Sequence, residues 1–101
     1  MEKVTVLAYF EAKPGMEEQL LAAIPAVVAA TRQEAACINY DFHRSTEEPT
    51  KFIFYENWTS LAGLEEHGRS AHIQTFRAAI KDLLVKPVEL KLYSMVTEPA
   101  S

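Results

Sequence analysis

The sequence predicts a single α+β domain in which an antiparallel sheet is covered by helices. Segments rich in β-branched and aromatic residues alternate with Ala- and Leu-rich stretches of helical periodicity, and Pro and Gly separate them. A length of 101 residues, with 49% hydrophobic and 24% charged residues, is typical of one soluble globular domain. We expect this domain to span residues 1–101, with a frayed tail at residues 97–101.

The first strand is expected at residues 4–11, because their sequence VTVLAYFE is β-branched and aromatic, and Lys13-Pro14-Gly15 ends it. A helix is expected from residue 16 to about residue 34. Its apolar residues recur at helical spacing: Met16, Leu20, Ile24, Val27 and Val28. Pro25 lies inside this stretch and lacks a backbone N–H, so we expect it to kink the helix or to split off its first two turns.

A hairpin is expected next. Residues 37–44 alternate, with Ile38, Tyr40 and Phe42 predicted on one side and the polar residues Asn39, Asp41 and His43 on the other. Residues 45–50 (STEEPT) are typical of a turn, and residues 51–57 (KFIFYEN) predict the second strand of the hairpin.

Two helices and a last strand complete the prediction. Thr59 or Ser60 can cap a short helix that ends near Gly68, and Ser70 can cap a longer one. The apolar stripe of the longer helix comprises Ile73, Phe76, Ile80 and Leu83. Lys86-Pro87 ends it, and residues 88–96 predict a strand. The order β-α-β-β-α-α-β fits a ferredoxin-like split βαβ sheet with helices on one face.

Three of the four expected strands are apolar or aromatic on both faces, yet the helices can cover only one. The other face would be an exposed apolar patch of a size that monomers avoid. We therefore expect a second copy of the chain to cover it through a two-fold symmetric interface, which makes the protein a homodimer. The alternative is that the C-terminal strand or tail folds across this face.

Composition argues against several classes of protein. Ten Lys and Arg against fourteen Asp and Glu give a net charge of −4, with no clustered basic face, so we expect no nucleic-acid partner. No apolar run approaches the roughly 18 residues of a membrane span, so no membrane partner is expected. The start Met1-Glu2-Lys3-Val4 does not have the pattern of a secretion signal, and the single Cys37 excludes an internal disulfide. A cytoplasmic location is expected.

A long pattern runs from Cys37 to Phe76. After the hairpin come Glu56-x-Trp58, then His67-x-x-Ser70-x-His72, and finally the phenylalanine. This pattern resembles the antibiotic biosynthesis monooxygenase (ABM) domain family, quinol monooxygenase type, whose members are dimeric α+β barrels. The resemblance extends over nearly the whole chain. One departure precedes Cys37, where the family often has Pro-Gly and this chain has Ala35-Ala36.

The resemblance implies a cofactor-independent monooxygenase that acts on quinol-type or polycyclic aromatics with O₂. Triplet dioxygen reacts slowly with closed-shell molecules unless the substrate donates one electron, and a deprotonated phenol or anthrone is such a donor. The protein then needs a general base with a pKa near the working pH, an apolar pocket, and a donor for the developing anion. Neither flavin nor metal is required, and the chain has no Gly-rich cofactor loop.

His67 is our candidate for the base, because histidine titrates close to neutrality, and Trp58 and His72 are candidates for orienting the substrate. Each histidine has an alternative role, a hydrogen bond to a backbone group freed at the helix break. The pocket walls are predicted from four aromatic residues, for which core packing is the alternative: Tyr40, Phe42, Phe54 and Phe76. Glu56 shares an apolar strand face that would raise its pKa, but pairing with a neighbouring Arg or Lys is favoured.

Other functions have weaker signals. A metal site of His43, His67 and His72 is not expected, because their spacing matches no ligand signature. Haem-degrading relatives use an Asn, a Trp and a proximal His where this chain has Ala8, His67 and Arg77. An isomerase of a small phosphorylated sugar would need cations at the pocket, for which Arg44 and Arg69 are candidates. A non-catalytic dimer that binds a hydrophobic metabolite also remains open.

Overall fold

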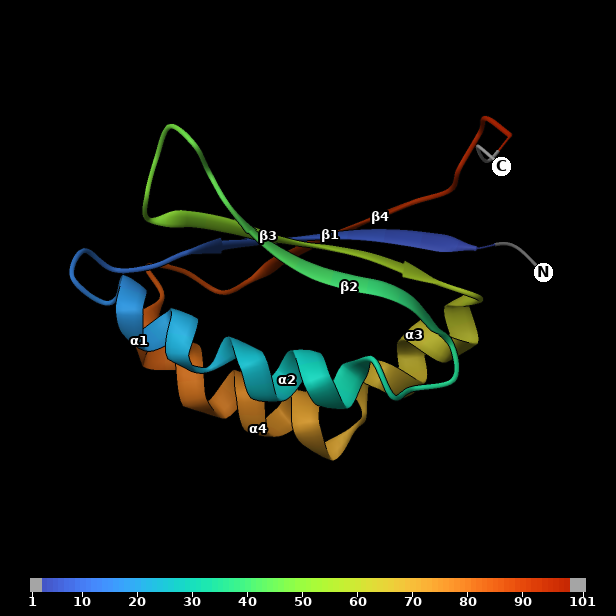
Figure 1. Cartoon of the computed structure of the whole chain (residues 1–101), viewed down its shortest axis with the longest axis horizontal. Helices are drawn as coiled ribbons and strands as arrows, with labels where there is room; N and C mark the ends of the chain where they lie inside the picture. Colours follow the sequence, from blue (N-terminus) through green and yellow to red (C-terminus); the bar gives the residue numbers. More distant parts are fainter. Residues whose placement is uncertain (1–2, 99–101) are drawn as a thin grey trace.

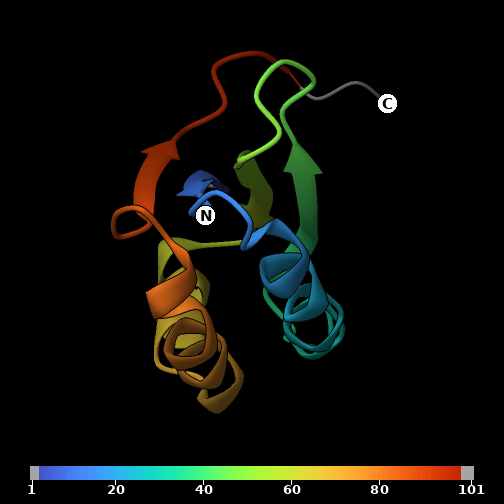
Figure 2. The ribbon, with the colours of Figure 1, turned by 90° about the vertical axis from the view of Figure 1, so that its left-hand side faces the viewer.

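One four-stranded antiparallel sheet, covered by helices on one face, makes up the computed structural model, which describes residues 3–98 (Figures 1 and 2). The strands are β1 (Val4–Glu11), β2 (Cys37–Arg44), β3 (Lys51–Trp58) and β4 (Glu89–Tyr93), in the order β2-β3-β1-β4. The helices are α1 (Glu17–Ala22), α2 (Ile24–Thr31), α3 (Leu61–Gly68), α4 (Ala71–Ile80) and the 3₁₀ turn η1 (Lys81–Leu83). The predicted ferredoxin-like α+β fold is confirmed.

The first helical stretch is split near Pro25, as the missing N–H predicts. The break falls at Ala23, and Pro25 lies in the first turn of α2, where its N–H would have no helical partner. Helix α2 ends at Thr31, earlier than the predicted end near Glu34. The carboxylate-bearing Glu34 therefore lies in the turn before β2, where its backbone N–H donates to the carbonyl of Thr31.

A bulge changes the predicted alternation at the start of β2. Cys37 lies opposite Trp58 and Asn39 lies opposite Asn57, so Ile38 is the extra residue. Ile38 is 46% exposed, whereas Tyr40 is buried, so the prediction that both point to the same side of the strand was wrong. The alternation holds from Asn39 onward.

The last strand is shorter than predicted. β4 pairs with β1 from Glu89 to Tyr93, and residues 88 and 94–96 lie outside it. Residues 97 and 98 belong to no strand, and the remaining part of the expected tail, residues 99–101, lies outside the described residues. No helix within residues 3–98 combines the length and apolar character that a membrane crossing requires.

The two predicted helix caps are confirmed, and they determine where α3 and α4 begin. The Ser60 hydroxyl accepts from Gly63 N at 3.1 Å, and the Ser70 hydroxyl accepts from Ile73 N at 3.3 Å. A Cβ at Gly63 would collide with the side chain of Ala36, so α3 lies directly against the segment that enters β2. This close contact brings the end of α3 next to the turn that follows α2.

The sheet has a buried face and an open face. Side chains of β1 and β3 alternate between them, and those under the helices form an aromatic core in which Tyr40 stacks on Phe54 with ring centroids 4.2 Å apart. The opposite face carries no helix among residues 3–98 (Figure 2). Apolar and aromatic side chains on that face are half-buried or exposed: Leu7, Tyr9, Ile53, Tyr55 and Tyr93.

Candidate active site

A cavity of about 700 Å³ lies between the covered face of the sheet and the helices α3 and α4. Its interior is lined by buried side chains, which are mostly apolar: Val6, Ala8, Phe10, Tyr40, Phe54, Glu56, His67, Ile73, Phe76, Ile80 and Leu84. Glu56 and His67 are the buried carboxyl and imidazole groups of this interior.

The cavity opens to solvent where its lining residues are exposed. We call these residues the mouth, and they comprise Arg77, Lys81, Val85, Lys86, Pro87 and Leu90. They come from the end of α4, from η1, from the loop that follows it and from β4. A ligand entering here would pass a charged opening before it reaches an apolar interior.

His67, in the last turn of α3, is 5% exposed and lines the interior. Its ring lies against two aromatic rings, with centroids 4.6 Å from Trp58 and 5.4 Å from Tyr40. Burial lowers the pKa of His67, although a hydrogen bond and the charge of Glu34 oppose this effect. The imidazole is therefore neutral at neutral pH and able to accept a proton.

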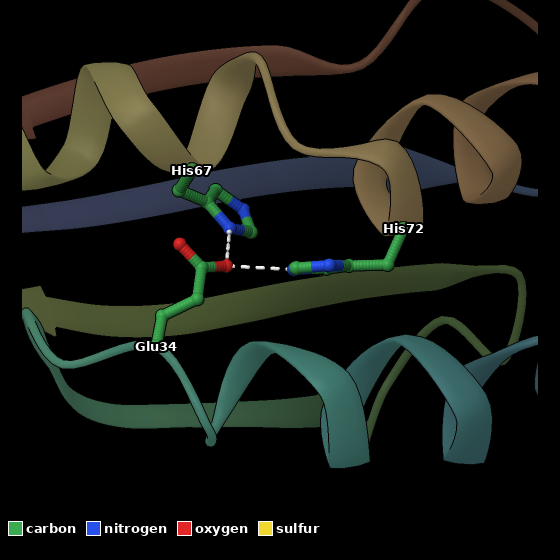
Figure 3. Close-up of side chains that lie close together, drawn as sticks. All are labelled: Glu34, His67 and His72. Atoms are coloured by element: carbon green, nitrogen blue, oxygen red, sulfur yellow. Dashed lines mark hydrogen bonds and ion pairs between the residues drawn. The ribbon is translucent and has the colours of Figure 1, made fainter.

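Glu34 joins the two candidate histidines. Its Oε2 lies 2.7 Å from Nδ1 of His67 and 2.7 Å from Nε2 of His72 (Figure 3). A carboxylate only accepts hydrogen bonds, so each of these ring nitrogens carries the proton and donates it. This arrangement leaves Nε2 of His67 with the free lone pair, which is the state that a general base requires.

Glu56, on β3, is 4% exposed, and its Oε1 accepts a hydrogen bond from Nε1 of Trp58 at 3.0 Å. Burial raises the pKa of Glu56 to about 7, with the Trp58 hydrogen bond acting in the opposite direction. The expected pairing with Arg or Lys was wrong, since no cation within residues 3–98 forms an ion pair with this carboxyl. The covered face of the sheet is apolar, and the basic residues of the cavity stay at its mouth.

The structure places the predicted site residues in two groups. His67, Tyr40, Phe54 and Phe76 line the cavity. The others, Trp58, His72 and Phe42, are not among its lining residues.

The three residues that do not line the cavity contact residues that line it, or a hydrogen-bond partner of such a residue. The Trp58 indole is fully buried, and its N–H is engaged by Glu56, so it touches the site through Glu56 and His67. His72 reaches the site through Glu34. Phe42 packs on Phe54 with ring centroids 4.6 Å apart and supports the cavity wall from behind.

Glu34, His67 and His72 could together hold a divalent cation. Each offers one ligand atom, and these atoms lie within 4.8 Å of one another. Two imidazoles with one carboxylate form a known zinc ligand set. Without an ion, the 2.7 Å separations are those of charge-assisted hydrogen bonds, which satisfy the same atoms. His43, the third histidine considered from the sequence, is exposed on β2 and lies at a second cavity of about 360 Å³.

Some of the residues considered for other functions line the main cavity, and others do not. Ala8 and Arg77 line the main cavity together with His67. Arg44 does not: its Nε donates to the Pro49 carbonyl at 2.8 Å, and its guanidinium lies over the Phe52 ring. The other candidate for phosphate binding, Arg69, is exposed after α3 and is not among the cavity's lining residues.

Sequence analysis did not single out Glu34. Its two partners lie 33 and 38 residues away along the chain, so no local pattern marks it. The one available signal is an acidic residue in an Ala-rich turn directly before a predicted strand.

Comparison with known proteins agrees with this architecture. The model of a family described as antibiotic biosynthesis monooxygenase matches residues 3–79. "Putative monooxygenase Rv0793" of Mycobacterium tuberculosis is 30% identical over 97% of this chain and 96% of its own length. "Putative monooxygenase YcnE" of Bacillus subtilis is 30% identical over 86% of this chain and 92% of its own length. The chain spans 64% of the length of a Synechocystis relative that is also 30% identical to it.

Solved structures show the same fold. The structure of Rv0793 from Mycobacterium tuberculosis has a TM-score of 0.90, with 97% of this chain and 99% of that chain covered at 30% identity. The structure of PA3566 from Pseudomonas aeruginosa has a TM-score of 0.88, covering 96% and 97% at 30% identity. With the family model matching most of its length, the chain belongs to the antibiotic biosynthesis monooxygenase family.

Proposed function

We propose that this protein is a cofactor-independent monooxygenase that oxidises a quinol, a polyphenol or a polycyclic aromatic with O₂. One observation carries the proposal: Glu56 and His67 line the same apolar cavity, and burial moves their pKa values in opposite directions. Such a pair supplies an acid and a base at one pH. The names of the Mycobacterium and Bacillus relatives support the reaction class.

In this proposal His67 is the catalytic base. Its Nε2 takes the proton of a substrate hydroxyl, and the imidazolium that forms is stabilised by Glu34 across 2.7 Å. The resulting phenolate, held in an apolar interior, donates one electron to O₂, and the two radicals combine at a ring carbon. Protonated Glu56 then supplies a proton to the departing oxygen, while Trp58 holds its carboxyl in place.

The electrons balance without an external reductant. A hydroquinone and one O₂ give a hydroxyquinone and one water, so one oxygen atom enters the ring and the other leaves as water. The substrate loses four electrons in total, and O₂ accepts all four. An anthrone reacts in the same way, with its CH₂ group oxidised to a carbonyl.

The proposal includes a homodimer formed through the open face of the sheet. The exposed aromatic residues Tyr55 and Tyr93 lie on this face with half-buried Leu7 and Ile53, which supports a second copy as the cover. Its formation would leave the cavity on the helix side of each subunit open to solvent. A cytoplasmic location is also proposed, as expected for a chain with one cysteine and no internal disulfide.

The test is oxygen uptake by metal-free and flavin-free protein on hydroquinones, naphthohydroquinones and anthrones, with ¹⁸O₂ as the oxidant. One labelled atom in the product, at a rate above autoxidation, is the expected result. Replacement His67→Ala should lower this rate by roughly 10²-fold. The same substitution at exposed His43, which lies on β2 outside the main cavity, is the control and should leave the rate unchanged.

The other functions predict different outcomes of the same panel. Tight binding of an aromatic without oxygen uptake would indicate a non-catalytic binder. Conversion of a phosphorylated ketose would indicate an isomerase, because an acid and a base in one cavity also suit proton transfer between neighbouring carbons. Either outcome, without uptake on any aromatic, overturns the monooxygenase proposal.

A further inference from the structure

We propose that the substrate carries an anionic group, and that Arg77, Lys81 and Lys86 bind this group at the mouth while the aromatic part of the substrate enters the interior. The inference rests on the proposed function and narrows its substrate class to an aromatic with a carboxylate or a group of similar charge. It starts from the distribution of charge around the cavity.

The mouth is cationic although the chain as a whole is acidic. The net charge is −4 with ten basic residues, yet three of these ten, Arg77, Lys81 and Lys86, line one cavity. Glu56 is the one carboxylate among the lining residues, and it is buried in the interior. Within residues 3–98, none of the three mouth cations forms an ion pair. No ion pair within the described residues therefore neutralises their charge.

Two of the cations lie four residues apart at the end of α4. Arg77 lies in the last turn of α4, and Lys81 follows four residues later in η1, which continues directly from this helix. Like charges at this spacing on a helix are destabilising. An anion held between the two side chains would remove this repulsion, so the arrangement favours a bound anion over the empty mouth.

Basic side chains are favoured at the C-terminal end of a helix, where the backbone carbonyls carry partial negative charge. This preference accounts for Arg77 and Lys81 at the end of α4. It does not account for Lys86, which lies in the loop between η1 and β4 and still lines the same cavity. Arg77 uses one nitrogen, since its Nη1 donates to the Gly68 carbonyl at 3.3 Å. A guanidinium has five N–H donors, so others remain for a ligand.

The expected strength is modest because the three cations are exposed. An exposed charge pair changes a dissociation constant by about two- to fivefold, so two cations together should account for roughly tenfold. The effect should weaken with added salt, because screening is strong between exposed charges at about 0.1 M ionic strength and above.

The test uses two probes that cannot react, 2-naphthoate and 2-naphthamide, which share a ring system and differ in charge. Calorimetric titration at low salt should show the carboxylate binding roughly tenfold more tightly than the amide. In Arg77→Gln/Lys81→Gln the carboxylate should lose most of this advantage, because Lys86 alone of the three cations remains, while the amide binds as before. The control Arg69→Gln/Lys51→Gln removes the same charges from exposed positions outside the main cavity and should keep the preference.

Equal affinity of the two probes for the unmodified protein, or a preference that is undiminished in Arg77→Gln/Lys81→Gln, overturns the inference. Failure of the carboxylate to bind overturns it as well. Oxygen uptake by the same preparations separates this result from the proposed function. Oxygen uptake on quinols without a charge preference would contradict only the proposed anionic group of the substrate. A charge preference without oxygen uptake would contradict only the proposed oxidation.

Discussion

The carboxylate of Glu34 accepts a hydrogen bond from Nδ1 of His67 over 2.7 Å, between residues that are 33 positions apart in the sequence. This bond decides which nitrogen of the ring carries the proton, because a carboxylate can only accept. The second bond, from Nε2 of His72, is donated to the same carboxyl oxygen (Figure 3). Glu34 is thus a positioning residue that acts on the site through His67.

Replacement of Glu34 by Gln should reduce turnover without weakening substrate binding. Glu34 does not line the cavity, so KM should stay within about twofold, while kcat falls roughly tenfold because the imidazolium loses its counter-charge. The pH limb of His67 should move to lower pH, since Glu34 raises the pKa of this ring. Steady-state kinetics across pH measure both effects. The exposed Glu65→Gln on α3 serves as the control, and an unmoved limb in Glu34→Gln would contradict the assigned role.

The pH dependence of kcat/KM should be bell-shaped. The rising limb reports the loss of a proton from His67, whose pKa lies below its ordinary 6.5, and the falling limb reports Glu56, with a pKa of about 7. The optimum should therefore lie below pH 7, between the two limbs. Replacement Glu56→Gln should remove the falling limb and lower kcat, because an amide cannot supply the proton. A falling limb that survives in this variant would assign it to another group.

Much of the fold follows from local patterns in the sequence. The split at Pro25, the caps Ser60 and Ser70, and the hairpin turn each depend on chemistry within a few residues, and the structure confirms them. The features that were predicted wrongly depend on contacts with residues far away in the sequence. Ile38 lies outside the core because β2 bulges at this residue where it pairs with β3. No residue type in this strand predicts the bulge.

The site was predictable only where a residue's own chemistry marks it. The unperturbed pKa of histidine lies close to neutrality, so His67 was identified as a candidate base from the sequence. The raised pKa of Glu56 depends on which face of β3 is covered and on the absence of a cation from its surroundings within residues 3–98, and both are tertiary facts. Trp58 was assigned to the substrate, whereas its N–H points to Glu56, two residues away on the same strand.

Glu56→Gln should also change how stability depends on pH. The folded-state pKa of about 7 lies above the ordinary 4.5, so the protonated carboxyl stabilises the fold fully below about pH 4.5, and this contribution is lost as the pH rises to 7. Gln keeps the acceptor for Trp58 and cannot ionise. At pH 8 the variant should therefore be more stable than the unmodified protein by about 2–3 kcal/mol, and at pH 4.5 the two should be equal.

Urea unfolding at both pH values measures this difference. The exposed Glu65→Gln is the control and should show the same stability as the unmodified protein at each pH. A difference between Glu56→Gln and the unmodified protein that is the same at pH 4.5 and pH 8 would show that ionisation of Glu56 is not its origin.

Removal of metal should leave oxygen uptake unchanged. In the proposed mechanism Glu34, His67 and His72 act as a hydrogen-bonded group, with 2.7 Å separations that already satisfy the carboxylate. Dialysis against EDTA, with metal content checked by elemental analysis, provides the measurement. Loss of uptake that is restored by a divalent cation would show instead that the three side chains bind an ion needed for turnover.

A charge placed on the open face of the sheet should dissociate the proposed dimer. Tyr55 is 40% exposed in the single chain, so Tyr55→Glu costs the isolated subunit little. In a two-fold interface the same substitution buries two carboxylates, one from each copy, against apolar neighbours such as Leu7, its cross-strand partner. Sedimentation velocity at micromolar concentration should show a dimer for the unmodified protein and a monomer for the variant. Leu61→Glu places the same charge at the start of α3, on a residue that is 50% exposed, and should remain dimeric. A monomeric unmodified protein would contradict the proposal, because the aromatic face of the sheet would then need another cover.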